Sequence, residues 1–388
     1  MTDMVHGSNP IRVSDPVIPR WWRTIDKWAL TSVFVLFGIG LLLGLAASVP
    51  LAARNDLPNP FHYVQRQALF GGVALVAMLV LSMLTPLQVR RAGVIVFAVA
   101  FLAVCLLPVF GTDFGKGATR WFSLGFASVQ PSEFLKPGFV IICAWLMAAS
   151  MDLNGPPGKS ASFVLMITVV GFLSMQPDFG QAALVLFSWG VIYFIAGAPM
   201  TLILGVTGLV VTGGFTAYEM SEHFARRING FLSPDLDPRT QLGYATNAIQ
   251  EGGFFGVGVG EGQVKWSLPD AHTDFIIAVA AEEYGLILVL FIIALYAVIV
   301  VRSLLRLMQE RDPFTRLAGT GLACIFGVQA VINIGVAVRL LPAKGMTLPF
   351  VSYGGSSLIA AGVTIGLLLA LTRERPRGGM ADIFRRGR

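Results

Sequence analysis

Ten continuously apolar stretches dominate the chain. They lie at 28–50, 67–85, 92–110, 132–149, 161–176, 180–198, 200–218, 275–301, 317–338 and 354–372. A helix needs about 20 apolar residues to span the hydrocarbon core of a bilayer. Continuous apolar runs also favour helices over the alternating strands of a membrane β-barrel. The pattern therefore predicts an all-α polytopic integral membrane protein with ten transmembrane helices.

The composition and the charge distribution agree with a membrane protein. Hydrophobic residues make up 55% of the chain and charged residues 13%, whereas a soluble domain carries about 25% charged residues. More of the 28 Lys and Arg residues lie on the side of the termini than on the other side. The positive-inside rule then places both termini in the cytoplasm. The basic residues are scattered over short loops, so we expect no nucleic-acid partner.

The stretches divide the chain into a cytoplasmic N-terminal segment (1–27), a membrane domain (28–372) and a basic cytoplasmic tail (373–388). One large extracytoplasmic loop, 219–273, lies between the seventh and eighth stretches. Loops longer than about 15 residues are usually functional or disordered. This loop has aliphatic and aromatic residues throughout, so we expect it to fold onto the membrane surface.

An acidic and a basic residue lie inside the fourth stretch. Glu133 and Lys136 are three positions apart and therefore share a helix face. Ionisable groups in a span are costly and mark functional sites by default. Two interpretations stay open: the pair only stabilises the bundle, or Lys136 holds an anionic head group that Glu133 orients.

A second acidic site opens the eighth stretch. Asp274 follows His272 and is expected in the first turn of a helix, where its charge would favour the helix dipole. Partial desolvation at a membrane rim would instead raise the pKa of the carboxyl toward neutrality, which suits a general base. Glu282 and Glu283 follow two turns later. We expect them to form a structural network with Arg339 or Lys344.

Two further outer segments carry polar groups. Arg120 and Trp121 lie in an aromatic and charged segment that suits the membrane interface. Ser352 and Ser356 flank two glycines at the start of the last stretch. A helix N-terminus there would favour an anion such as a phosphate, although the glycines could serve only close helix packing.

Together these segments resemble the SEDS family (shape, elongation, division and sporulation) over about residues 28–372. Division-type members are the most similar, and elongation-type members are the alternative. Tyr284 stands where the family usually has leucine. The matching motifs, in order, are GATRW at 117–121, QPSEFLK at 130–136, QPDFG at 176–180, HTDFI at 272–276, EEYG at 282–285 and LPFVSYGGSS at 348–357.

The resemblance implies an inverting peptidoglycan glycosyltransferase that polymerises lipid II, a polyprenyl-pyrophosphate donor. It would act on the outer face of the bacterial cytoplasmic (inner) membrane, at the division septum. The family's essential aspartate corresponds to Asp274, which would take a proton from the acceptor hydroxyl. The expected substrate-binding residues are Lys136, Glu133, Arg120, Trp121, Lys344, Arg226, Arg227, Ser352 and Ser356.

The resemblance also implies partners: lipid II, a class B penicillin-binding protein acting as transpeptidase, and other division-complex membrane proteins. No cofactor is certain, and no metal-binding residues are assigned. A divalent cation (Mg²⁺ or Mn²⁺) could share the neutralisation of pyrophosphate, without a dedicated ligand cage in the sequence. A lipid II flippase and a non-catalytic division scaffold are the competing functions. The motifs gather on the outer face, which favours the transferase.

Overall fold

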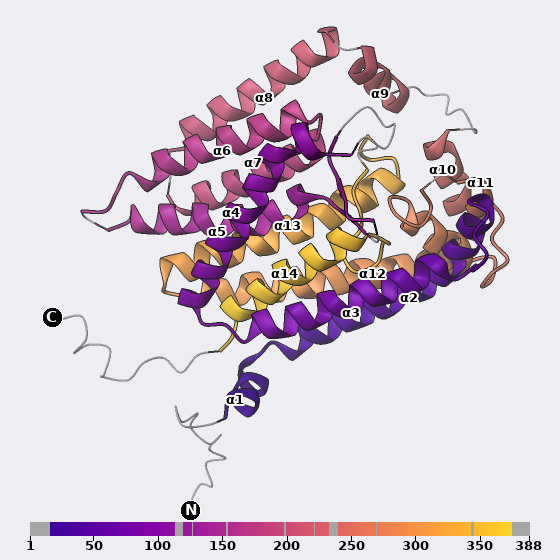
Figure 1. Cartoon of the computed structure of the whole chain (residues 1–388), viewed down its shortest axis with the longest axis horizontal. Coiled ribbons are helices and arrows are strands. Elements are labelled where there is room, and N and C mark those ends of the chain that lie inside the picture. Colours follow the sequence, from indigo (N-terminus) through magenta and orange to yellow (C-terminus); the bar gives the residue numbers. More distant parts are fainter. Residues whose placement is uncertain are drawn as a thin grey trace, which may run out of the picture.

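The computed structural model describes residues 16–112, 119–125, 127–152, 154–197, 199–220, 222–232, 240–268, 270–342 and 345–374. These residues form a helical bundle with one short antiparallel hairpin (Figure 1). The elements are α1 (Val17–Thr24), α2 (Lys27–Arg54), α3 (His62–Ser82), α4 (Pro86–Phe110), β1 (Phe122–Ser123), β2 (Ser128–Val129), α5 (Pro131–Ala149), α6 (Gly158–Met175), α7 (Phe179–Ile195), α8 (Met200–Met220), α9 (Glu222–Leu232), α10 (Gln241–Gly252), α11 (Val264–Ser267), α12 (Ile276–Met308), α13 (Pro313–Ala337) and α14 (Gly355–Leu371).

The predicted helical membrane fold is confirmed. Each predicted apolar stretch is helical, as α2 to α8 and α12 to α14. In the described part of the chain, 8 helices are long and apolar enough to cross a membrane, and α7 and α14 are shorter apolar helices. The eighth stretch, predicted at 275–301, belongs to a longer helix, Ile276–Met308. In its last two turns, Arg302 and Arg306 both pair with the buried Asp26, at 3.1 and 3.0 Å.

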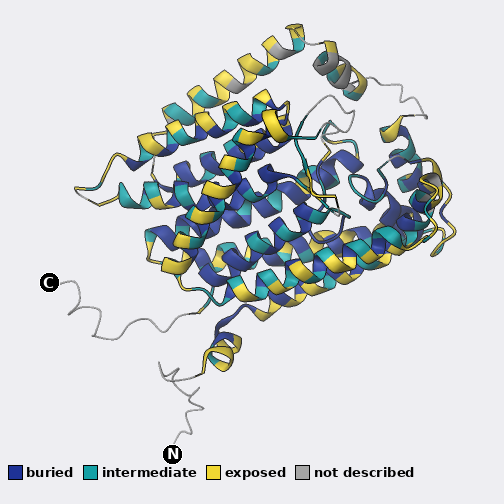
Figure 2. Ribbon diagram, viewed as in Figure 1, coloured by how far each residue is buried: buried dark blue, intermediate teal, exposed yellow. Residues whose placement is uncertain are grey.

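α13 lies at the centre of the bundle. It packs against α5, α7, α12 and α14, while α3 packs along α14 and α4 along α5. Burial follows this arrangement, with the inner helices dark and the outer ones mixed (Figure 2). α8 diverges from the bundle (Figure 1), and none of its apolar span is buried in protein. Such a helix suits a lipid environment, because its apolar side chains have no water-excluding protein surface around them.

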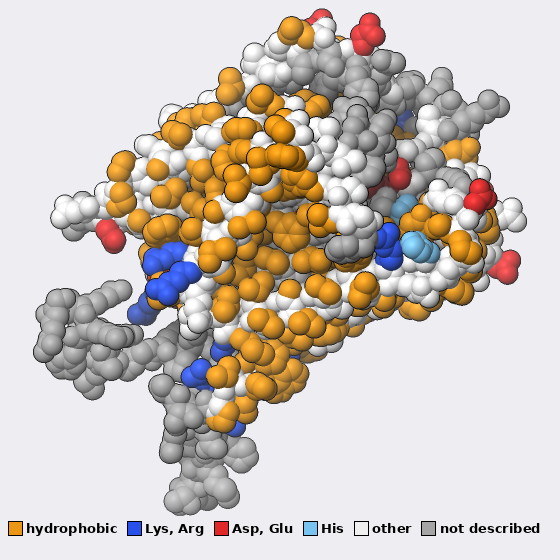
Figure 3. Space-filling view, viewed as in Figure 1, with side chains coloured by type: hydrophobic (Ala, Val, Ile, Leu, Met, Phe, Trp, Pro, Cys, Tyr) orange, Lys and Arg blue, Asp and Glu red, His pale blue; other side chains and the backbone are white. Residues whose placement is uncertain are grey.

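The first and last described helices meet at one end of the bundle. Arg373, just beyond α14, donates from Nε to Thr24 Oγ1 of α1 at 3.0 Å. Several Lys and Arg side chains lie at this end, along the left and lower-left edge of a broad apolar surface (Figure 3). Both ends of the described chain therefore lie on the same side, as the sequence predicted. The cytoplasmic identity of that side stays a prediction.

The loop between α8 and α12 contains helical pieces, and part of it packs against α12. Ala245 and Ala248 of α10 form a small apolar cluster with Phe275 and neighbouring residues. α12 is interrupted at Gly285, which has φ 76°. A Cβ there would lie 2.3 Å from Phe254 O, so only glycine allows this close approach. The predicted folding of the loop is thus confirmed in its described part, and its contact with the membrane surface stays a prediction.

Candidate active site

Asp274 lies in a turn just before α12. The N–H groups of Thr273 and Asp274 donate to Asp270 O at 3.0 and 3.1 Å, which closes the turn two residues before the helix begins at Ile276. The expectation that Asp274 occupies the first helical turn is therefore wrong. The N-cap of α12 is Phe275, without a side-chain cap. The half-buried Asp274 carboxylate faces the next outer connection, because a Cβ on Gly345 would lie 3.5 Å from Oδ2.

The turn is held by the segments on either side of it. His272 packs with Tyr63 and Tyr353, with ring centroids 5.5–5.6 Å apart for all three pairs. Tyr353 N donates to His272 O at 2.9 Å. Ser352 Oγ donates to Thr273 O at 2.5 Å and accepts from Leu348 N at 2.9 Å. Asn333 Nδ2 donates to Asp274 O at 3.0 Å.

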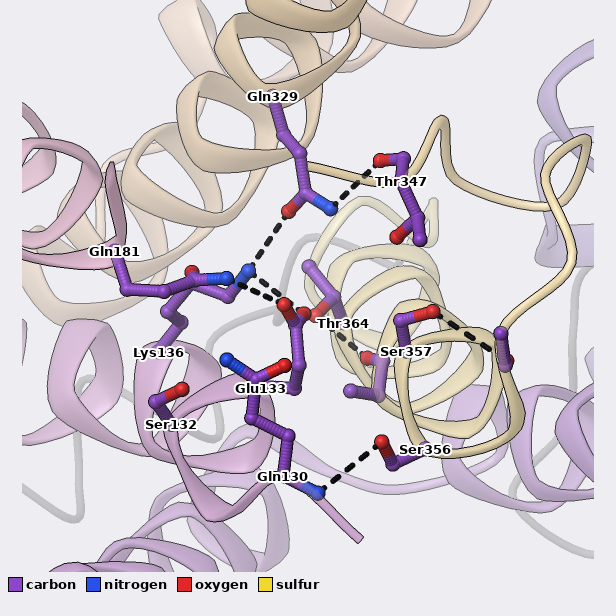
Figure 4. Close-up of polar contacts among 12 residues, drawn as sticks. Gln130, Ser132, Glu133, Lys136, Gln181, Gln329, Thr347, Ser356, Ser357 and Thr364 are labelled. Carbon is purple, nitrogen blue, oxygen red and sulfur yellow. Dashed lines mark hydrogen bonds and ion pairs between the residues drawn. The ribbon is translucent and has the colours of Figure 1, made fainter. Parts of the chain in front are cut away.

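The predicted pair in α5 is formed and buried. Lys136 Nζ lies 2.8 Å from Glu133 Oε2, and the two residues are only 3% and 5% exposed. Each member has a second partner (Figure 4): Gln181 Nε2 donates to Glu133 Oε1 at 2.5 Å, and Lys136 donates to Gln329 Oε1 at 2.8 Å. Hydrogen bonds to both ions offset part of the cost of burying the charges.

A small cavity lies beside this pair. Its lining includes Glu133, Lys136, Phe326, Ser357 and Thr364. It has room for about one water molecule, so it does not admit a sugar in this state. The hydroxyl-bearing residues that line it are Ser357 and Thr364 of α14 rather than the predicted Ser352 and Ser356.

Ser352 and Ser356 are buried, and their hydroxyls are engaged within the chain. Ser352 connects the Asp274 turn to the segment before α14, because its hydroxyl bonds to both Thr273 O and Leu348 N. Ser356 Oγ accepts from Gln130 N at 3.2 Å. The substrate contacts of both serines stay predictions.

Arg120 lies against the connection between α6 and α7. Its Nε donates to Gln176 O at 3.0 Å, and its Nη1 lies 4.0 Å from Asp178 Oδ1. Asp178 Oδ2 accepts from Gln130 Nε2 and Ser132 Oγ at 3.1 and 3.2 Å. Burial raises the pKa of the Asp178 carboxyl, and the positive charge of Arg120 opposes this. Arg120 is therefore connected to the start of α5, one turn from Glu133.

Trp121 is half-buried beside the short hairpin. Its carbonyl accepts from Thr112 N at 2.8 Å. Lys344 lies outside the described residues. Arg226 and Arg227 lie on α9, but their side chains are outside the described part. The predicted substrate-binding roles of Trp121, Lys344, Arg226 and Arg227 stay predictions.

The buried carboxylates Glu282 and Glu283 belong to a structural network, as expected. The partner that the structure shows is Lys265 of α11, which the sequence did not predict. Lys344 lies outside the described residues, and the predicted pairing with Arg339 or Lys344 stays a prediction. Lys265 Nζ pairs with Glu283, while Glu282 accepts from Val264 N at 2.7 Å and from Lys265 N at 3.2 Å. The outer loop folds back onto α12, which brings α11 to these acids.

Sequence reasoning missed four polar residues of the site. Asp178, Gln181, Gln329 and Asn333 are buried. Gln329 Nε2 donates to Thr347 O at 3.2 Å, and Asn333 Nδ2 also donates to Met346 O at 2.5 Å. For Gln181, Gln329 and Asn333 the available signal was a carboxamide inside an apolar stretch, and for Asp178 it was the QPDFG motif at 176–180. Within the described ranges, no group of three or more His, Cys, Asp and Glu side chains is placed to hold a metal ion.

The fold and these contacts define a polytopic helical membrane protein with a buried ion pair linked through carboxamides to the backbone of a turn that carries a half-buried carboxylate. The chain belongs to the family described as "Cell cycle protein", whose model groups FtsW, RodA and SpoVE and matches residues 27–377. This is the family that the sequence motifs resembled.

Relatives and solved structures agree with this assignment. A Caulobacter vibrioides protein named probable peptidoglycan glycosyltransferase FtsW is 42% identical over 92% of this chain and 91% of its own length. An Alkalilimnicola ehrlichii protein of the same name is 36% identical over 91% and 90%. The predicted resemblance to the division type is thereby confirmed.

Among solved structures, a chain from a peptidoglycan synthase complex that coordinates polymerization and crosslinking matches with a TM-score of 0.72 and 28% identity. The rod shape determining protein RodA of Thermus thermophilus matches with a TM-score of 0.65 and 26% identity. Each match covers 90% of this chain and 97% of the other.

Proposed function

We propose that this chain is a division-type peptidoglycan glycosyltransferase that polymerises lipid II on the outer face of the cytoplasmic membrane. Its family and the names of its relatives support the activity. One structural observation carries the proposal further. The backbone carbonyl of Asp274 is joined, through Asn333, the 345–348 segment and Gln329, to the buried Lys136.

Asp274 is the proposed general base. Polymerisation joins the 4-hydroxyl oxygen of one sugar to the anomeric carbon of the next, and the hydroxyl proton must leave as the bond forms. A positioned carboxylate accepts that proton and contributes about 10²–10⁴ in rate. In an inverting reaction the hydroxyl attacks opposite the leaving pyrophosphate, so the base and the cationic groups must lie on different sides of the reacting sugar.

Lys136 is the proposed partner of the departing pyrophosphate. Negative charge grows on the leaving group, and a preorganised cation in a dry site stabilises that charge more than water does. Glu133 and Gln329 hold the ammonium in place, and Gln181 holds Glu133. The cavity beside it has room for about one water molecule, so lipid II must bind to a wider state of the bundle.

A divalent cation fits this proposal only as a companion of the substrate. Magnesium usually binds through one or two carboxylates together with substrate phosphates. The pyrophosphate oxygens and water would supply the ligands here, because Asp274 acts on the opposite side of the reacting sugar. The proposed cation would neutralise phosphate charge, and the proton transfer to Asp274 does not depend on it.

The proposed partner is a class B penicillin-binding protein, together with other division proteins at the septum. A match to a chain of a peptidoglycan synthase complex supports an assembly with a crosslinking enzyme. Long apolar helices support a multi-pass membrane location, and the division-type relatives support the inner membrane at the septum.

Purified protein incubated with lipid II tests the proposal, with glycan chains separated by gel electrophoresis. We expect Asp274→Asn to lower the polymerisation rate by at least about 10²-fold, while membrane insertion is unchanged. Asp152→Asn, in the α5–α6 connection, is the matched control and should polymerise normally. Near-normal polymer from Asp274→Asn would remove this residue from the mechanism. Movement of lipid II across vesicles without polymer would instead support a flippase.

A further inference from the structure

The turn that carries Asp274 is held by its backbone carbonyls. Three consecutive carbonyls each accept a hydrogen bond from a different donor. The contacts are Tyr353 N to His272 O (2.9 Å), Ser352 Oγ to Thr273 O (2.5 Å) and Asn333 Nδ2 to Asp274 O (3.0 Å). The direction in which the Asp274 side chain leaves the backbone is therefore set by neighbouring segments and not by α12, which begins two residues later.

Asn333 is the donor that joins the turn to a second segment. Its Nδ2 group also donates to Met346 O at 2.5 Å. A carboxamide nitrogen has two N–H donors, and here each has its own backbone carbonyl. The side chain thus connects the turn before α12 with the connection between α13 and α14, although Asp274 and Met346 are far apart in the sequence.

One atom of Asn333, the acceptor Oδ1, costs stability in its buried position. The residue is 2% exposed, and its Oδ1 has no hydrogen-bond partner among the described residues. Burying an unsatisfied acceptor is costly, and an apolar side chain of similar size would avoid that cost. The stabilising contacts of Asn333 are accordingly its two donated bonds.

Gln329 repeats this arrangement one helical turn earlier on α13. Residues four apart share a helix face. Gln329 Nε2 donates to Thr347 O at 3.2 Å, and its Oε1 accepts from Lys136 Nζ at 2.8 Å (Figure 4). The two carboxamides hold adjacent carbonyls of the 345–348 segment. One of them reaches the Asp274 turn and the other reaches the buried ion pair.

We propose that Asn333 is a positioning residue for the reaction: its amide fixes the Asp274 turn relative to the 345–348 segment and, through Gln329, to Lys136. This inference rests on the proposed role of Asp274 as general base. Asn333 itself touches neither the substrate nor the reacting atoms. It sets the spacing between the base and the cation, and a displacement of about 1 Å in such a spacing costs about 10² in rate.

Asn333→Leu in the full-length protein tests the proposal, because leucine keeps the approximate volume and removes both donors. We expect faster hydrogen–deuterium exchange at 272–276 and 345–348, with unchanged exchange in α3 and α4. In polymerisation assays, kcat should fall by about 10²-fold while KM for lipid II changes less than about twofold. Ser188→Ala, a buried hydroxyl of α7 that bonds only to its own helix, is the control and should change neither measurement.

Ser352→Ala is the second variant and removes the donor to Thr273 O. If Asn333→Leu does not fold, hydrogen–deuterium exchange and polymerisation kinetics of Ser352→Ala test whether the held turn positions Asp274. A fall in kcat without a change in KM supports positioning, whereas a rise in KM alone contradicts it and supports a substrate contact.

Unchanged exchange at 272–276 in a folded Asn333→Leu protein would overturn the inference. So would faster exchange with a normal kcat. If the wild-type protein makes no polymer, the proposed function fails. The exchange measurement then still decides whether Asn333 orders the turn.

Discussion

The buried pair of Glu133 and Lys136 permits a test that separates its structural role from its chemical role. Lys136→Met removes the ammonium and leaves Glu133 with Gln181 as its remaining partner. It also leaves Gln329 Oε1 without its donor. Removing one partner of a buried ion pair costs about 3–5 kcal/mol, and a position only 3% exposed should fall within that range.

The double variant Glu133→Gln, Lys136→Met should recover most of this loss. The introduced glutamine keeps an oxygen that can accept from Gln181, and no charge stays buried. Replacing a buried ion pair by neutral groups of similar volume is often neutral in stability. We therefore expect the free energy of unfolding to return to within about 1 kcal/mol of the wild-type value.

Denaturation in detergent micelles measures the free energy of unfolding, and lipid II polymerisation measures the reaction rate. If Lys136 binds pyrophosphate, the stable double variant should still lose at least about 10²-fold in rate. Glu374→Gln is the control. Its side chain is 72% exposed and pairs with Arg306 at 3.3 Å, so it should cost less than about 1 kcal/mol.

Two results would refute this reasoning. Unchanged stability of Lys136→Met would mean that the pair carries no net energy. A stable double variant with a wild-type rate would mean that the pair only stabilises the bundle.

Three further changes test other parts of the structure. Gly285→Ala should destabilise the protein by more than about 1 kcal/mol, because its φ of 76° disfavours a side chain and a Cβ would meet Phe254 O; an unfolding curve identical to that of the wild type would contradict this. Lys265→Met leaves Glu283 buried without its cation, so hydrogen–deuterium exchange in α10 and α11 should accelerate; unchanged protection there would count against the network. EDTA should lower the polymerisation rate, while calorimetry of the substrate-free protein with Mg²⁺ should detect no tight site; a tight site without substrate would contradict a substrate-borne cation.

The helices of this fold could be predicted because a bilayer requires a long apolar run wherever a helix crosses it. That requirement is local, so composition along the chain is sufficient to find it. The interruption of α12 at Gly285 could not be predicted in this way. Glycine is common in membrane helices, and its positive φ arises only where the outer loop packs against the helix.

The partner of Glu283 was missed for a related reason. The sequence shows that two adjacent buried carboxylates need a cation, and this expectation was correct. It does not show which cation arrives, since that depends on how the residues before α12 fold back. Lys265 belongs to a helix of four residues, Val264–Ser267, that no hydrophobic periodicity distinguishes from the surrounding loop.

The candidate site shows why a search limited to charged residues is incomplete. Glu133 and Lys136 were found because ionisable groups are rare in apolar stretches, and Asp274 was found because it lies at the edge of one. Gln329 and Asn333 lie in the same kind of stretch and are four residues apart, which places both on one helix face. A buried carboxamide also needs partners, because an unpaired polar group in a dry interior is costly. Two carboxamides on one face of a predicted span therefore indicate a polar segment packed against that face. In this protein that segment is the one that connects the ion pair to the backbone of the Asp274 turn.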